Sequence, residues 1–197
     1  MRKLPLQVQP RIIFATGAVL ALAAMLVLCA PAGAQGVYAA LTPPLTIVSS
    51  NSTFEIDLAL TQAGTPINAY DAVVVYDPAA LTFMPTSPLS LQEGSSMTGV
   101  CGSTFHLFHQ SGDTLFITHS LLCNMASLAG PAPQLYRLHF KATGSPQTTV
   151  IHLLPTTQFY NEGIYVNPLY PEDAVVQIQF ATPAAPKTWS RLRQLYR

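Results

Sequence analysis

Apolar and polar residues alternate along most of the chain between residues 45 and 180. This period of two is typical of β-strands that bury one face and expose the other. In TFEIDLAL, residues 53–60, apolar side chains fill the even positions, and Glu55 and Asp57 point to the opposite side. No segment shows a helical period longer than one turn. We therefore predict an all-β fold, an antiparallel jelly-roll β-sandwich of about nine strands, with further strands at 45–50, 68–76, 104–121, 134–143, 148–155, 157–166 and 173–180.

The strand at 68–76 stops abruptly at Tyr76-Asp77-Pro78. Pro78 has no backbone N–H and holds the preceding residue in extended geometry, so ladder pairing must end at about Tyr76. Asp77 is a favourable helix N-cap and proline suits the first helical position, so one short helical turn should follow. Leu81 can then return to the core. We assign a structural role to Tyr76, Asp77, Pro78 and Leu81.

A β-hairpin is indicated by two aromatic and β-branched runs that flank Gly112. A turn centred on Gly112 places His119 opposite Phe105, about 13 Å from His109 along the sheet. His106 and His109 fall on opposite faces of their strand by parity. We therefore expect no metal site among these histidines.

The N-terminus has the three parts of a secretory signal: a basic start, an apolar stretch over 12–29 and small residues at 32–34. We expect cleavage before Gln35, and hence no stable membrane span in the mature protein. One alternative is an uncleaved anchor, because the apolar stretch is nearly long enough to span a bilayer. Another is a lipoprotein modified at Cys29, which the large Leu28 disfavours. The predicted organisation is a signal peptide at 1–34, one sandwich domain at 35–181, and a Pro-containing linker with a short basic tail at 182–197.

Export would place the mature chain in the extracellular medium, at the cell surface or in the periplasm, where disulfides persist. Cys101 and Cys123 are the two cysteines that remain after cleavage, and they bracket the hairpin. We predict that they form a disulfide at its base, which would stabilise the fold by roughly 3 kcal/mol on the chain-entropy estimate. A catalytic cysteine is the alternative, but no local signature supports it.

The formal net charge of zero conceals an asymmetry along the chain. Residues 35–181 carry nine acidic and two basic residues, a net charge of −7, which argues against a nucleic-acid partner because phosphate binding needs clustered Lys and Arg. Trp189 and Leu192 lie at helical spacing in the tail, which is either a frayed helix resting on the sandwich or a sorting or anchoring tag. The tail reverses the sign with four basic residues and no acid: Lys187, Arg191, Arg193 and Arg197.

The sequence contains no pattern of an enzyme. A hydrolase needs two carboxyl groups at a fixed separation, or a nucleophile with a base, and neither pattern is present. Glu55 and Asp57, about 7 Å apart on one strand face, are interpreted as solvated acids. No cofactor is expected; Asp71 with Asp77 is the candidate pair for calcium, although no Asp-x-Asn-x-Asp-Gly loop occurs. Three tyrosines near the last strands either pack at the sandwich edge or stack on sugar rings: Tyr160, Tyr165 and Tyr170.

Three motifs in order give the chain its resemblance to a known family. The first is Tyr76-Asp77-Pro78 with Leu81 three residues after the proline, the second is Leu135-Tyr136-Arg137-Leu138-His139-Phe140-Lys141, and the third is the closing EDAVVQIQF, residues 172–180. Over residues 45–180 the chain resembles a cohesin-type domain, in which a long strand ends in Tyr-Asp-Pro and a later strand has the form Leu-x-x-Leu-x-Phe-Lys.

The resemblance implies a nine-stranded jelly roll related to carbohydrate-binding modules, a non-catalytic role, and recognition of a dockerin across one sheet face. The outward positions on the matching strand are Asp71, Val73 and Val75, with Ala69 where many cohesins have asparagine. This face is more apolar than a dockerin site usually is. The expected function is an exported, cohesin-like binding module that attaches to a dockerin-like protein at the cell surface or in a secreted polysaccharide-degrading assembly. The alternative is a stand-alone carbohydrate-binding module with a polysaccharide as its partner.

Overall fold

The computed structural model describes residues 36–169 and 171–180. They lie within one compact unit, Gln35–Arg197. The predicted signal peptide at 1–34 and the predicted linker and tail at 182–197 fall outside the described residues, so both remain predictions. Within the described part, no helix is long and apolar enough to cross a membrane.

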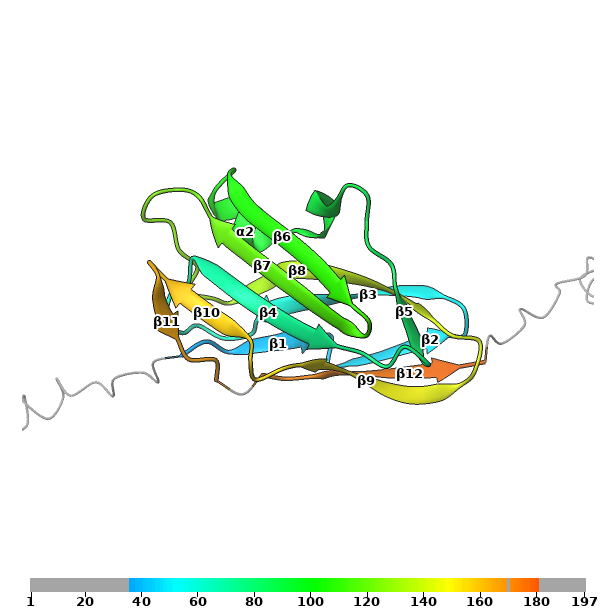
Figure 1. Cartoon of the computed structure of the whole chain (residues 1–197). Helices are drawn as coiled ribbons and strands as arrows, with labels where there is room; N and C mark the ends of the chain where they lie inside the picture. Colours follow the sequence, from blue (N-terminus) through cyan, green and yellow to red (C-terminus); the bar gives the residue numbers. More distant parts are fainter. Residues whose placement is uncertain (1–35, 170, 181–197) are drawn as a thin grey trace, which may run out of the picture. The chain divides into compact units, whose positions relative to one another are not determined.

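Two β-sheets pack face to face, as Figure 1 shows. The smaller sheet has four strands in the order β1–β3–β8–β5. In the larger, eight-stranded sheet, β4 pairs with β7 along its whole length and with β10 and β9 on its other side, and β6 lies outside β7. The strands are β1 (Ala39–Thr42), β2 (Leu45–Ser49), β3 (Thr53–Leu60), β4 (Ala69–Val75), β5 (Leu81–Phe83), β6 (Thr104–Ser111), β7 (Thr114–Leu121), β8 (Ala132–Ala142), β9 (Gln147–Leu153), β10 (Gln158–Asn161), β11 (Ile164–Val166) and β12 (Ala174–Gln179).

The predicted all-β sandwich is confirmed. The described part has twelve strands where the sequence predicts about nine, because several are short pieces such as β1, β5 and β11. Its pairs are antiparallel except that β12 and β2 run parallel. The connection from β5 to β6 contains a 3-10 helix η1 (Leu89–Gln92) and a short α-helix α2 (Ser95–Val100). The described chain enters through β1 at one end of the sandwich and leaves through β12 at the other (Figure 1).

An aromatic cluster fills the core between the two sheets. Phe140, on β8, is fully buried at its centre. Its ring centroid lies 5.3 Å from that of Tyr76, 5.5 Å from that of Phe83 and 5.8 Å from that of Phe54. The first two contacts are edge-to-face, a geometry that aromatic rings prefer. The end of β4 is thereby held against the opposite sheet.

The turn after β4 has the capped geometry that the sequence predicts. Asp77 Oδ1 accepts a hydrogen bond of 2.9 Å from the backbone N–H of Ala79. The Asp77 carbonyl accepts hydrogen bonds from the N–H groups of Ala80 and Leu81, at 3.1 and 2.9 Å, which closes a single helical turn. Leu81 is buried directly after it as the first residue of β5. The cap therefore sets where the chain crosses from one sheet to the other.

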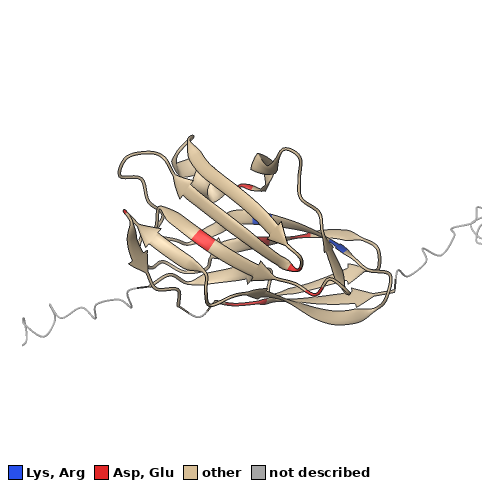
Figure 2. Ribbon diagram, viewed as in Figure 1, with Lys and Arg blue, Asp and Glu red and all other residues tan. Residues whose placement is uncertain are grey.

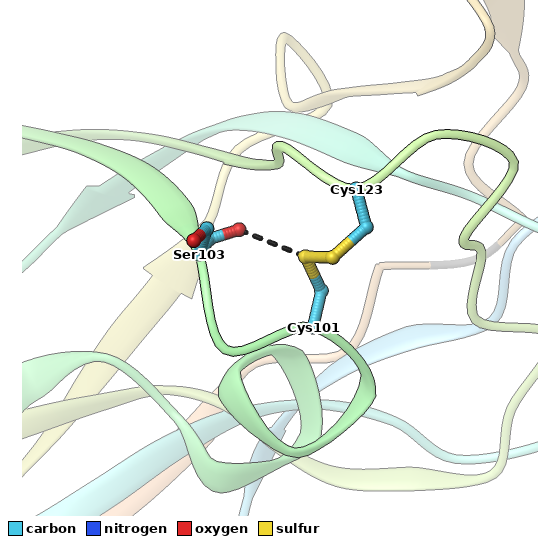
Figure 3. The surroundings of a disulfide bond; sticks show 3 residues. All are labelled: Cys101, Ser103 and Cys123. Carbon is cyan, nitrogen blue, oxygen red and sulfur yellow. Dashed lines mark hydrogen bonds between the residues drawn. A yellow bond between two sulfur atoms is a disulfide. The ribbon is translucent and has the colours of Figure 1, made fainter.

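The disulfide predicted at the base of the β6–β7 hairpin is present between Cys101 and Cys123, whose Cα atoms lie 5.8 Å apart. Figure 3 shows that Cys101 directly follows the helix α2, and that its sulfur approaches the carbonyl oxygen of Ser103 at 3.0 Å. Cys123 follows the end of β7. The bridge ties the end of α2 to the larger sheet.

Replacing Asp77 with alanine should lower the free energy of unfolding by about 1 kcal/mol, because the Ala79 N–H loses its side-chain acceptor. Asp77→Asn is the matched control, since the amide oxygen can still accept this hydrogen bond. Urea unfolding followed by tyrosine fluorescence measures both variants. Equal unfolding midpoints for Asp77→Ala and the wild type would show that the cap does not stabilise the turn.

Reduction of the Cys101–Cys123 bridge should lower the free energy of unfolding by about 3 kcal/mol, because the bridge closes a loop between residues 22 positions apart in the unfolded chain. Urea unfolding with and without dithiothreitol measures the loss. The double variant Cys101→Ser, Cys123→Ser is the control and should not respond to the reductant. A wild-type midpoint that dithiothreitol leaves unchanged would contradict the prediction.

Candidate functional site

The outward face of the four-stranded sheet is charged and internally paired. Arg137, on β8, lies 3.1 Å from Glu55 and 3.0 Å from Asp57, both on β3. His139 lies 3.4 Å from Glu55. These acids are half-buried or exposed and are bridged by one guanidinium group, which fits the solvated acidic pair expected from the sequence. Such a face is satisfied in water and offers little that another molecule could bury.

The outward face of β6, β7 and β4 in the larger sheet carries exposed apolar side chains beside polar ones such as His109, Thr114 and Thr118. Figure 2 shows this front layer almost without charged residues, apart from one acidic position on β4 and one at the turn of the hairpin. Phe105 and Leu107 of β6 and Phe116 of β7 are 49%, 58% and 41% exposed. We call this surface the apolar face and define it by six residues: Asp71, Val73, Val75, Phe105, Leu107 and Phe116.

Strand pairing places the members of the apolar face in rows across the sheet. Leu107 pairs with Thr118, which pairs with Asp71. In the next row, Phe116 pairs with Val73. Directly paired residues point to the same side of a sheet. The face is therefore continuous over three strands.

The three positions that the sequence assigned to partner binding lie together on this face. Asp71, Val73 and Val75 alternate on the outward side of β4 and are each partly exposed, between buried neighbours. Asp71 Oδ1 accepts a hydrogen bond of 2.6 Å from the Thr118 hydroxyl group, which fixes the carboxylate against β7. A second carboxylate, Asp77, lies beyond the strand end in the capped turn and is not part of the face.

Phe105, Leu107 and Phe116 were not predicted to be part of the binding face. The predicted pairing register of the hairpin was wrong. The turn consists of two residues, Gly112 and Asp113, so that Ser111 pairs with Thr114. A turn centred on Gly112 alone shifts the pairing by one residue, and such a shift moves every side chain of one strand to the other side. His119 consequently pairs with His106 and not with Phe105. Alternation along 104–111 was the signal available in the sequence, but it needed the correct turn.

A polar cluster lies under the apolar face, between the sheets. Glu93, in the link from η1 to α2, approaches His119 Nε2 with Oε2 at 3.1 Å and His106 Nδ1 with Oε1 at 3.7 Å. The first contact has ion-pair distance but not the alignment of a hydrogen bond. The two imidazole rings lie 5.8 Å apart, centroid to centroid. We call Glu93, His106 and His119 the buried triad.

Two tyrosines and a glutamine complete the surroundings of the buried triad. Tyr136 of β8 lies 2.9 Å from His106 Nε2 and accepts a hydrogen bond of 2.6 Å from Gln92 Nε2. Tyr70 of β4 lies 3.2 Å from His119 Nδ1 and donates to the Leu135 carbonyl group. Burial raises the pKa of both tyrosines, so their hydroxyl groups stay protonated.

Burial also lowers the pKa of both histidines of the triad, because a charged imidazole is poorly solvated there. The carboxylate of Glu93 opposes this lowering for each ring, and the neighbouring His106 adds to it for His119. The side chains of the triad are between 0% and 11% exposed. A substrate cannot reach them, so the cluster has the chemistry of a catalytic site without its access.

The tyrosines considered for sugar stacking form a pair with tilted planes. Tyr160 of β10 and Tyr165 of β11 have ring centroids 6.4 Å apart and planes at 73°. This edge-to-face geometry does not provide one flat surface for a sugar ring. Tyr170 lies outside the described residues.

Two hollows lie on the surface of the sandwich, and neither has converging reactive groups. One, of about 380 Å³, lies beside Tyr165, and the other, of about 510 Å³, lies beside Pro131. Neither is lined by an acid, a histidine or a cysteine. Among residues 36–169 and 171–180, no three His, Cys, Asp or Glu side chains are arranged to hold a metal ion.

No protein-family model matches the sequence, and no curated protein matches it. The structure is similar to several solved cohesin modules. The seventh ScaB type I cohesin of Pseudobacteroides cellulosolvens has a TM-score of 0.59 at 8% identity, over 77% of this chain and 97% of that one. A non-cellulosomal cohesin of the archaeon Archaeoglobus fulgidus has a TM-score of 0.50 at 9% identity, over 80% and 97%. CaCohA2 of Clostridium acetobutylicum, in its complex with a variant of CaDoc0917, has a TM-score of 0.51 at 13% identity, over 73% and 99%. This chain has the fold of the cohesin modules, the fold that Tyr76-Asp77-Pro78 and the later strands led us to expect.

Proposed function

We propose that this protein is an exported, non-catalytic binding module, and that it holds a dockerin-like protein partner against the apolar face. The observation that carries this proposal is the exposure of Phe105, Leu107 and Phe116 on one outward sheet face, whose single carboxylate is Asp71 on β4. Exposed apolar side chains that are contiguous mark interaction surfaces more often than scattered ones do.

The contrast between the two sheet faces supports the choice of surface. On the smaller sheet, Arg137 is already paired with Glu55 and Asp57, so burial there would cost desolvation without a new partner. On the apolar face, covering Phe105, Leu107 and Phe116 removes apolar area from water, which is favourable. Asp71 would restrict the orientation of the bound partner, because a single charge in the interface needs a complementary group of the partner opposite it.

The similar structures support the kind of partner. CaCohA2 was solved in complex with a variant of CaDoc0917, and the family resemblance implies dockerin recognition through the strand that carries Asp71, Val73 and Val75. The Archaeoglobus fulgidus protein is described as non-cellulosomal, so this fold is not confined to cellulosomes. For the present chain we propose attachment at the cell surface or in a secreted assembly, which the signal-like N-terminus favours.

A non-catalytic role agrees with the interior of the sandwich. The buried triad, which brings two histidines and a carboxylate together, is closed off by η1, α2 and the sheets. A stand-alone carbohydrate-binding module remains the competing function, and the tilted pair Tyr160 and Tyr165 gives it little support. Binding experiments decide between the two.

Leu107→Asp should weaken binding to a dockerin by about tenfold or more, because the new carboxylate would have to be desolvated in the interface. Asp71→Lys should weaken it as well, by reversing the charge that β4 presents on the face. Isothermal titration against a panel of dockerins that includes CaDoc0917 measures both. Ile47→Asp is the matched control: Ile47 is also 58% exposed and lies on the larger sheet, but on the far strand β2, so its binding should stay within about twofold of the wild type.

Retention of the protein on insoluble polysaccharide, without binding to any dockerin of the panel, would replace the proposal with the carbohydrate-binding alternative. If Leu107→Asp and Asp71→Lys bound as tightly as the wild type, the partner would use a different surface.

A further inference from the structure

We propose that the buried triad makes the apolar face sensitive to acid: proton uptake by His106 and His119 loosens β6 from the sandwich and releases the partner. The release of a partner rests on the function proposed above, whereas the loosening of β6 does not.

The triad and the apolar face belong to the same strands. On β6, His106 points inward between Phe105 and Leu107, which point outward. On β7, His119 points inward beside Thr118, which contacts Asp71 on the outer side. Because neighbouring residues on a strand point to opposite sides, a movement of the inner side chains moves the outer ones too.

One negative charge faces two imidazoles. Glu93 approaches them from the link before α2. The phenol groups of Tyr136 on β8 and Tyr70 on β4 also face them and stay neutral. The six residues of α2, Ser95–Val100, supply no titratable side chain. A first proton on the pair of histidines is balanced by the Glu93 carboxylate, but a second leaves a net positive charge between rings 5.8 Å apart in the core.

β6 is the element that can yield. It is an edge strand whose backbone pairs with β7 alone, and its last three residues are exposed. Beneath it, His106 contacts Tyr136 and Glu93, Thr104 also donates a hydrogen bond to Glu93, and Phe108 stacks on Phe83, so the triad supplies part of the attachment of β6 to the rest of the sandwich. The neighbouring segment is held better, since the Gly94 N–H donates to the Leu135 carbonyl group and the disulfide fixes the end of α2. Edge elements with few buried contacts are the first to open.

The direction of the pH effect follows from the environment of the histidines. Burial lowers the pKa of His106 and His119 from the ordinary value of 6.5, and opening to water restores that value. Between pH 6.5 and the lowered pKa values, the opened state therefore binds more protons than the closed one. Acidification through this window favours opening, and a return to neutral pH closes the strand.

The opening of β6 is tested by hydrogen–deuterium exchange followed by mass spectrometry, on protein expressed from the full-length sequence. Between pH 7.5 and 5.0, with times corrected for intrinsic exchange, amide protection in 104–111 should fall about tenfold in the wild type, and protection in β12 should change less than about twofold. In the double variant His106→Gln, His119→Gln, the pH-dependent loss of protection in 104–111 should be no larger than the loss in β12. His109→Gln, His152→Gln is the control, because these two histidines are exposed and should leave the wild-type response intact.

A wild-type β6 that is equally protected at both pH values would overturn the proposal, and so would a response that survives in the double variant. If that variant does not fold, His106→Gln alone should still reduce the response, because it removes one of the two protons.

Dockerin affinity at pH 7.5 and 5.0 is the second arm. Any dockerin that binds the wild type should bind it about tenfold more weakly at pH 5.0, and the double variant about equally at both. Failure of every dockerin to bind would count against the proposed function alone, since the exchange arm still decides on the opening of β6.

Discussion

The alternation of side chains across β6, β7 and β4 is the constraint on which both the interior and the proposed binding face depend. A two-residue turn with Gly112 at a φ of +61° fixes the pairing of the hairpin, and full-length pairing of β7 with β4 extends that register into the sheet. With this register, Phe105 and Leu107 lie outside and His106 lies inside. A shift by one residue would bury one set and expose the other. The apolar exterior and the polar cluster beneath it are therefore two sides of one arrangement.

Local signals in the sequence were enough for the architecture. Alternation identified the long strands β3, β4 and β8, since a period of two needs no knowledge of the partner strand. The end of β4 and its capped turn followed from Asp77 and Pro78, because the effects of proline on its own and the preceding residue are local. The disulfide followed from the two cysteines that cleavage of the predicted signal peptide would leave. The strand β1 escaped detection because its four residues carry too little pattern.

The candidate site was only partly predictable, because it depends on contacts between residues that are far apart in the sequence, and no local pattern encodes such contacts. Asp71, Val73 and Val75 were placed on the outward side by parity from the end of β4, and this parity holds in the structure. To predict which residues of β6 and β7 face outward, the geometry of the turn had to be known, because a turn shifted by one residue reverses the sides. Glu93 is the extreme case: it lies in a segment that reads as a loop, and its role depends on histidines brought beside it by folding.

The two ends of the described chain leave the sandwich at opposite ends of its length, through β1 and β12 (Figure 1). A pull on the two ends is therefore directed along the strands. β12 is hydrogen-bonded to β9 on one side and to β2 on the other, and β1 is hydrogen-bonded to β3, so mechanical load would shear several backbone hydrogen bonds at once and not peel them apart one by one. A module that tethers one body to another gains from this geometry, because resistance to tension comes from the sheets themselves.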